Sequence, residues 1–412
     1  MNYSVEILQK AKEIHNRVLV LDTHIDINTD HFTFHKNYSH DLDNQVNLPK
    51  MDKGGLDVAW LIVYTAQGAL TQDGYNQAYN NAIRKFDAIK RLTTEIAPQK
   101  IGLATNSSQV KELHASDKKI VMIGVENAYP IGTNISVVKE FYDQGARYMS
   151  LSHNGHNQFC HSNTGEQEPF GIDKGLSNLG KQLVVEMNKL GMMIDVSHPS
   201  KQSMKDMIEL SKAPIIASHS SARALCDHSR NLDDEQLKWM KKNGGVVQAV
   251  AFSAYINSEK HCIYEQALNQ KISQLVKNHG VKMKPWNEIQ KMKNFETEKF
   301  ISTYKDICEE VLSLITEKDP RPVDVADFVD HIDYLIDVMG IDHVGISSDF
   351  DGGGGIDGWN DASETLNITA ELVKRGYTES QIIQLWGGNL LRVLDEVEKI
   401  AKELQSKEIS SL

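Results

Sequence analysis

Cysteine is scarce in this sequence, with four residues in a chain of 412, and none of them belongs to a Cys-x-x-Cys pair. Their wide spacing excludes a disulfide framework and zinc-finger spacing. No apolar run reaches the length that crosses a membrane. The start of the chain lacks the basic and apolar segments of a secretion signal, and residues 406–412 lack the hydrophobic tail of a lipid-anchor signal. We therefore expect a cytoplasmic protein with no membrane anchor in the chain.

The sequence also has fewer basic than acidic residues. The chain has 44 Lys and Arg residues against 56 Asp and Glu residues, which gives a net charge of -12. This balance argues against a nucleic acid or an anionic membrane surface as partner. The length is sufficient for a large buried core, and it suits either two to three domains or one long α/β barrel.

Short apolar segments alternate with helical ones along most of the chain, which predicts a parallel sheet with helical crossovers. The predicted strands are an apolar run at 17–20 that leads into the polar end of the first strand, and 55–64, 119–126, 148–153, 191–198, 214–219, 244–252 and 343–349. The predicted helices are 5–16, 75–95, 134–145, 176–190, 200–212, 232–243, 378–385 and 387–404. Eight such units indicate an α/β fold, the (β/α)8 TIM barrel.

A doubly wound open sheet is the alternative fold, and it would carry a glycine-rich phosphate turn after the first strand. The sequence has no such turn. Four glycines at 352–355 follow the last strand instead, without the Gly-Lys-Ser/Thr of a phosphate loop, and we interpret them as a mobile loop.

One interval interrupts the alternation. Almost ninety residues, rich in Lys and Glu, separate the seventh and eighth strands, with helical periodicity at 299–316 and 323–339. We interpret the chain as a single barrel over 1–412 with a helical insertion at 256–338 before the last strand. A lid or an oligomer contact would suit such an insertion.

Most predicted strands end on residues that bind metals or transfer protons. His24 and Asp26 close the first strand and point to the same side of it, because side chains alternate along a strand. Others end on Glu126, His153, His198, His219 and Asp349. Active sites of barrels lie at these carboxyl ends. The set suffices for two metal ions, with Glu126 as the bridge, His24 and Asp26 on one ion, and His198 and His219 on the other.

With these residues in place, the chain resembles the membrane (renal) dipeptidase family of metal-dependent amidohydrolase barrels over nearly its whole length. The motifs that carry the resemblance lie at 22–26 (DTHID), 124–126 (GVE), 151–157 (LSHNGHN), 194–198 (IDVSH), 217–220 (ASHS), 228–231 (HSRN), 345–352 (GISSDFDG) and 387–393 (GGNLLRV).

The resemblance implies a dipeptidase with two zinc ions per chain that hydrolyses dipeptides, including ones with a C-terminal D-residue, by a metal-bridging hydroxide. It implies that His153 polarises the scissile carbonyl and binds substrate, and that Asp349 relays the proton from water to the leaving amine. Arg230 would hold the substrate's terminal carboxylate as a bidentate pair, and Tyr255 would lie near the substrate. It leaves a homodimer open.

Residues 127–130 (NAYP) depart from the loop that usually follows the bridging glutamate in the family, and the insertion is longer than in its mammalian members. One alternative is another activity of these barrels, either deacylation of N-acyl amino acids or lactone opening. Such relatives often bridge their metals with a carbamylated lysine, and no predicted strand ends in Lys. A catalytically silent metal-binding homologue is the other alternative, against which Asp349, His153 and Arg230 together argue.

Overall fold

The computed structural model describes residues 3–168, 173–279, 303–304, 306–307 and 309–410. At its centre, parallel strands follow one another in the order β1-β2-β4-β5-β6-β7-β8-β9. A parallel bridge between Ile25 and Phe350 joins the last strand to the first, so the sheet forms the ring of a (β/α)8 barrel. The strands are β1 (Leu21–Asp26), β2 (Val58–Tyr64), β4 (Lys119–Glu126), β5 (Ala146–Ser150), β6 (Met193–Asp195), β7 (Ile216–Ala217), β8 (Val246–Val250) and β9 (Val344–Ser347).

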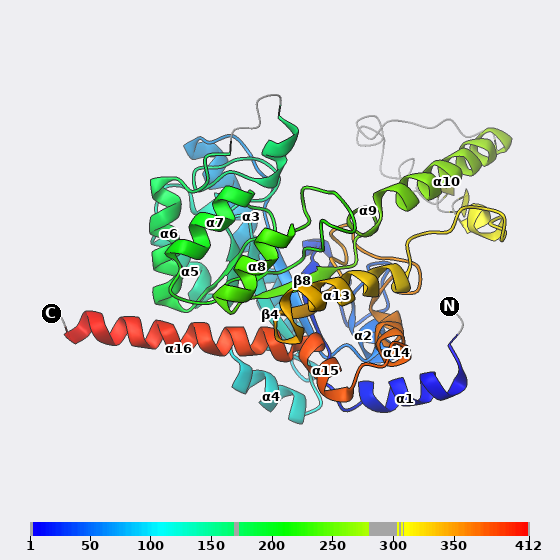
Figure 1. The fold of residues 1–412 in the computed structure, drawn as a ribbon, viewed down its shortest axis with the longest axis horizontal. Coiled ribbons are helices and arrows are strands. Elements are labelled where there is room, and N and C mark those ends of the chain that lie inside the picture. The colour runs from blue at the N-terminus through cyan, green and yellow to red at the C-terminus, as the bar shows by residue number, and fades with distance from the viewer. Residues whose placement is uncertain (1–2, 169–172, 280–302, 305, 308, 411–412) are drawn as a thin grey trace. The chain divides into compact units, whose positions relative to one another are not determined.

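Helices alternate with these strands and surround the ring, as Figure 1 shows for the adjacent helices α5 to α8. They are α1 (Val5–His15), α2 (Leu48–Gly54), α3 (Gln72–Arg91), α4 (Ser107–Ala115), α5 (Val137–Asp143), α6 (Asn178–Leu190), α7 (Lys201–Leu210), α8 (Asp234–Asn243), α9 (Ser253–Ile256), α13 (Val325–Met339), α14 (Leu366–Lys374), α15 (Glu379–Ile383) and α16 (Asn389–Ser410). None of the described helices is both long enough and apolar enough to cross a membrane.

Local sequence signals fix where these helices begin and end. The side chains of Ser177 and Ser200 accept hydrogen bonds from the first turns of α6 and α7, and Asp233 and Asp324 form capping boxes at α8 and α13. Gly191 ends α6 in the left-handed region at φ 84°, a conformation that costs glycine little. These caps end the helices at defined residues, so that short connections return the chain to the next strand.

The core is densely apolar because parallel strands in a barrel are covered on both faces. Every residue of β4, β5 and β8 is buried or nearly so. Inside the ring, the rings of Trp60 and Tyr148 stack at 5.0 Å. Gly124 faces the Tyr148 ring so closely that a Cβ there would overlap it. The interior of the barrel is therefore a packed core.

The chain separates into two compact units, Met1–Ile256 with Asp324–Leu412, and Asn257–Val323. The first contains the whole barrel. In the second, α10 (Ser258–Asn278) contributes to a small apolar cluster of Ile272, Leu275, Val276, Ile307 and Val311. The insertion at 256–338 stays a prediction. Its last part, α13, belongs to the unit that contains the barrel. The helix predicted at 299–316 lies partly outside the described residues.

The predicted barrel is confirmed, with differences in detail. The first strand is Leu21–Asp26, so it consists of the polar motif that we placed at its end, and the apolar run at 17–20 precedes it. A ninth strand, β3 (Ile101–Leu103), pairs with the first half of β4 and was not predicted. It is too short to show a period, as are α2, α4 and α14, which our interpretation also omitted.

Candidate active site

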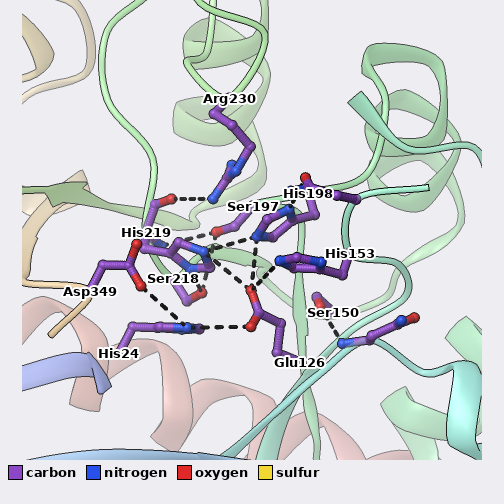
Figure 2. Close-up of polar contacts among 12 residues, drawn as sticks. His24, Glu126, Ser150, His153, Ser197, His198, Ser218, His219, Arg230 and Asp349 are labelled. Carbon is purple, nitrogen blue, oxygen red and sulfur yellow. Dashed lines mark hydrogen bonds and ion pairs between the residues drawn. The ribbon is translucent and has the colours of Figure 1, made fainter. Parts of the chain in front are cut away.

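The carboxyl ends of the parallel strands bring the predicted residues together, because every such end lies at the same opening of a barrel. There they surround a cavity of about 700 Å³. All of the residues predicted for the site line this cavity except His24, which is buried in β1 beside them. Figure 2 shows the arrangement, with Arg230 entering from the side opposite His24 and Glu126.

Glu126, at the end of β4, is the central group, and its two carboxylate oxygens face different histidines. Oε1 lies 2.8 Å from Nε2 of His198, 3.4 Å from Nε2 of His219 and 3.9 Å from Nε2 of His153. Oε2 lies 3.7 Å from Nε2 of His24. Burial opposes ionisation of this carboxyl, but His24 and His153 hold the pKa of Glu126 well below its usual value. Glu126 is therefore an anion with one oxygen available to each of two cation positions.

His24 turns its Nε2 toward the carboxylates of Asp26 and Glu126. Its Nδ1 lies 3.0 Å from the hydroxyl of Tyr148, and that hydroxyl donates its own proton to the carbonyl of Thr23 at 3.0 Å. Nδ1 must therefore carry the proton and donate it to Tyr148. The remaining nitrogen, Nε2, is buried and has no hydrogen-bond partner among the described residues, which is the condition of a metal ligand without its ion.

His219 is oriented in the same way by a different pair of groups. The hydroxyl of Ser218 donates to Asp195 at 2.6 Å and lies 2.8 Å from Nδ1 of His219, so Nδ1 donates to that hydroxyl. Asp195 therefore stands behind His219, through Ser218. The side chain of His198 turns instead toward Asn154, whose Oδ1 lies 3.2 Å from Nδ1 of His198.

The donor atoms fit a metal centre. Nε2 of His198 lies 3.1 Å from Nε2 of His219, and both approach Oε1 of Glu126. With both Nδ1 atoms occupied as donors, two lone pairs and an anionic oxygen converge with no proton between them. Burial lowers the pKa of His198 and His219 well below the usual value, with the nearby Arg230 acting in the same direction. Neutral imidazoles and carboxylates in this arrangement are zinc-type ligands.

Three groups of side chains could each hold an ion: His24 with Asp26 and Glu126, Glu126 with His153 and His198, and His24 with His219 and Asp349. The first is the predicted ligand set for one ion. The overlap of the groups shows how closely His153 and Asp349 lie to the predicted ligands. Their separate roles stay predictions.

Asp349 follows β9 in a conformation that few residues adopt. Its φ is 59°, in the left-handed region that Asp tolerates better than most side chains. Burial and the neighbouring carboxylates of Asp26 and Glu126 raise the pKa of Asp349 to about 8, against the opposing effect of His24. A Cβ on Gly352 would overlap both the Asp26 and Asp349 carboxylates. The glycines that we interpreted as a mobile loop thus leave room for the site, and Gly354 donates a backbone hydrogen bond to Asp349.

Arg230 lies in the loop after β7 and is 2% exposed. Nη2 donates to the carbonyl of His219 at 2.9 Å, and Nη1 to the hydroxyl of Ser220 at 3.4 Å. Its Nε has no partner among the described residues. The guanidinium lies 5.6 Å from the centre of the Tyr255 ring, which stacks on Phe252. The loop thus holds a planar cation at the cavity wall with a donor to spare for an anion.

Sequence reasoning missed several residues of the site. Tyr148, Ser218 and Asn154 orient the three histidines, and Lys85 of α3 lines the cavity beside Tyr64. Ser218 and Asn154 lie inside quoted motifs and could have been tested as partners of neighbouring histidines. Tyr148 and Lys85 have no local signal, since only the barrel brings them to the site. Asp351 also lines the cavity and accepts a hydrogen bond from the backbone of Gln45.

A barrel that presents histidines and carboxylates from its strand ends to one polar cavity defines a metal-dependent hydrolase of the (β/α)8 class. The chain belongs to the membrane dipeptidase family, peptidase family M19, whose model matches residues 8–408. It is a metallo-dipeptidase, as the resemblance of its motifs implied.

Relatives agree with this assignment. Dipeptidase aclJ of Aspergillus oryzae is 28% identical over 95% of this chain and 81% of its own length, and dipeptidase tcpJ of Claviceps purpurea is 27% identical over 88% and 71%. Among solved structures, the probable dipeptidase PvdM of Pseudomonas aeruginosa is 33% identical, with a TM-score of 0.78 over 97% of this chain and all of that one.

Proposed function

We propose that this enzyme uses two zinc ions to hydrolyse the single peptide bond of small dipeptides. The observation that carries the count of two is the bridging position of Glu126, whose Oε2 faces His24 while Oε1 faces His198 and His219. His24, Asp26 and Glu126 would hold one ion, and Glu126, His198 and His219 the other. Bound there, the pair would lower the pKa of water and polarise the scissile carbonyl.

The protein's own groups would handle protons and charge. The Asp349 carboxylate, 3.9 Å from Nε2 of His24, is placed to accept the proton of the attacking water and return it to the leaving amine. His153 lies across the site, with its ring 4.2 Å from that of His198. From there it would donate a hydrogen bond to the carbonyl oxygen as negative charge develops.

Arg230 would bind the free carboxylate of the substrate's C-terminal residue. Its unpartnered Nε and its two η-nitrogens form the planar fork that a carboxylate matches. The Tyr255 ring beside it would cover the apolar part of that residue. An anion-binding wall at the end of a limited cavity favours dipeptides over longer chains, because the carboxylate must lie one residue from the cleaved bond.

A C-terminal D-residue is part of the proposal. A panel of L-L dipeptides, L-D dipeptides and N-acyl amino acids, assayed on zinc-loaded protein, tests the substrate class directly. We expect hydrolysis of dipeptides with a free C-terminal carboxylate, whether L or D. Turnover confined to N-acyl amino acids would contradict the proposal. The homodimer and the cytoplasmic location stay predictions, for sedimentation and cell fractionation to test.

The role of Asp349 is open to a single substitution. Because Asp349→Asn removes the proton acceptor but keeps the size of the side chain, kcat should fall by about 100- to 10,000-fold. Zinc content, measured by plasma mass spectrometry, should stay at two ions per chain. Activity within tenfold of the parent protein would show that another group carries the proton.

A further inference from the structure

Lys85 is a buried cation in the cavity without an assigned role. It lies in α3, is 9% exposed and lines the cavity. None of the described residues forms a hydrogen bond or an ion pair with its ammonium group. Its one close neighbour of note is the ring of Tyr64, whose centre lies 5.3 Å from Nζ.

A buried ammonium group is costly unless an anion compensates it. Burial lowers the pKa of Lys85, and the carboxylates of Asp26 and Glu126 only partly oppose this. Those two carboxylates lie beyond ion-pair distance of Lys85 and are committed to the metal centre. Elsewhere in the described chain, half-buried lysines are paired: Lys119 with Asp57 at 3.4 Å, and Lys50 with Asp361 at 3.0 Å. This difference from the paired lysines indicates that the anion that compensates Lys85 comes from a bound ligand and not from the protein.

The position of Lys85 is opposite that of Arg230. Tyr64 ends β2, whereas Arg230 follows β7. Around the ring, β4, β5 and β6 separate these two strands on one side, and β8, β9 and β1 on the other. The two cations therefore lie at facing walls with the metal centre between them. A dipeptide whose carboxylate is on Arg230 and whose peptide bond is at the metals directs its N-terminal residue toward Lys85.

We propose that Lys85 binds a carboxylate carried by the N-terminal residue of the dipeptide, so that the enzyme prefers acidic residues at that position. The inference rests on the proposed function and names the substrate class of the same site. Two kinds of dipeptide offer this group. An α-glutamyl dipeptide presents its side-chain carboxylate, and a γ-glutamyl dipeptide presents its α-carboxylate.

Matched substrates test the preference. We expect kcat/KM for Glu-Ala to exceed that for its isosteric amide Gln-Ala by about 10- to 100-fold, the range of a charge-assisted hydrogen bond, and γ-Glu-Ala to exceed its own α-amide similarly. In Lys85→Met this ratio should fall to about one through loss on the acidic substrate, with Gln-Ala little changed. Lys119→Met is the control, since it removes a paired lysine from the opposite end of β4 and should keep the parental ratio.

A binding measurement separates this inference from the proposed function. Calorimetry on zinc-loaded protein would compare phosphinate mimics of Glu-Ala and Gln-Ala, with the acidic mimic binding more tightly to the parent than to Lys85→Met. Lys85→Gln serves if the Met variant does not fold, and Lys85→Glu should turn the preference toward Lys-Ala. Equal treatment of acid and amide by the parent, or a ratio that survives in Lys85→Met, overturns the proposal. Failure of every dipeptide to be hydrolysed would instead contradict the dipeptidase function, and the calorimetric comparison would still decide on Lys85.

Discussion

Each histidine that we predict to bind a metal ion is oriented through its other ring nitrogen, Nδ1. Tyr148 fixes His24, the Asp195–Ser218 pair fixes His219, and Asn154 fixes His198. A hydrogen bond to Nδ1 determines the tautomer and thereby leaves the lone pair of Nε2 for an ion. The direction of each Nε2 therefore depends on polar residues outside the predicted set of metal ligands.

Ser218→Ala should therefore weaken zinc binding without touching a ligand. Removing the hydroxyl breaks the link between Asp195 and Nδ1 of His219, and the affinity for zinc should fall by about 10- to 100-fold in chelator competition. The control is Ser221→Ala, because Ser221 is equally buried but bonds to the backbone of Val250 in β8. Equal zinc affinities in the two variants would contradict an orienting role for Ser218.

Binding of the substrate carboxylate by Arg230 should require the planar shape of its guanidinium as well as its positive charge. Arg230→Lys keeps the cation but loses the planar fork, so KM for dipeptides with a free carboxylate should rise by about 10- to 100-fold. The corresponding dipeptide amides, which offer no carboxylate, should be affected far less. The same increase for both substrate series would show that Arg230 supports the fold of the loop and does not bind the substrate terminus.

At the scale of secondary structure, α13 supports the cavity wall that contains Arg230 and Tyr255. His331 of α13 is 2% exposed, accepts a hydrogen bond from the backbone of Ala222 at 3.1 Å and donates one to the carbonyl of Ile256 at 2.9 Å. Ala222 precedes the loop that carries Arg230, and Ile256 directly follows Tyr255. One neutral histidine thus joins both segments that we propose to bind substrate to the same helix.

This arrangement makes stability depend on pH in a defined direction. Burial lowers the pKa of His331 below its ordinary value of 6.5. The unfolded chain therefore binds a proton below about pH 6.5 that the folded protein excludes, so this group lowers stability as pH falls. His331→Leu should cost about 1–3 kcal/mol at pH 7, because a buried N–H and a buried C=O lose their partner. Its deficit relative to the parent should narrow toward pH 5 in urea unfolding.

The exposed His114 of α4 provides the control for that measurement. His114→Leu should change the free energy of unfolding by no more than about 0.5 kcal/mol at either pH. A deficit of His331→Leu that stays constant between pH 7 and pH 5 would show that protonation of His331 is not linked to unfolding.

For the whole molecule, the proposed metal centre would stabilise the fold as well as supply catalysis. Its predicted ligands come from β1, β4 and the segments after β6 and β7, so bound ions would join strands from across the ring. Ions that bind only the folded state stabilise it by mass action, about 4 kcal/mol at a thousand-fold excess over Kd. Removing zinc with a chelator should abolish activity and lower Tm by several degrees. Two equivalents of zinc should restore both, and a Tm indifferent to chelation would contradict the linkage.

The sequence by itself determined the barrel and the end of it at which the predicted site residues gather. Alternating apolar and helical segments predict the barrel, because a parallel sheet needs helical crossovers and leaves its strands buried on both faces. The residues that close those strands predict the place of the site, since all carboxyl ends of a barrel meet at one opening. Glu126 and Asp349, more than two hundred positions apart, line one cavity for this reason, and His24 is buried beside them.

Only the tertiary structure decided which side chains hydrogen-bond the predicted site residues and which lie opposite them across the barrel. Tyr148 reaches His24 from another strand, Asp195 acts on His219 and not on His198, and Lys85 faces Arg230 across the ring. None of these relations has a period or a motif, because each depends on side-chain direction and on the curvature of a closed sheet. Leu21–Asp26 illustrates both: its sequence predicted a pair of metal ligands, and the fold supplied the Tyr148 hydroxyl that directs Nε2 of His24 into the site.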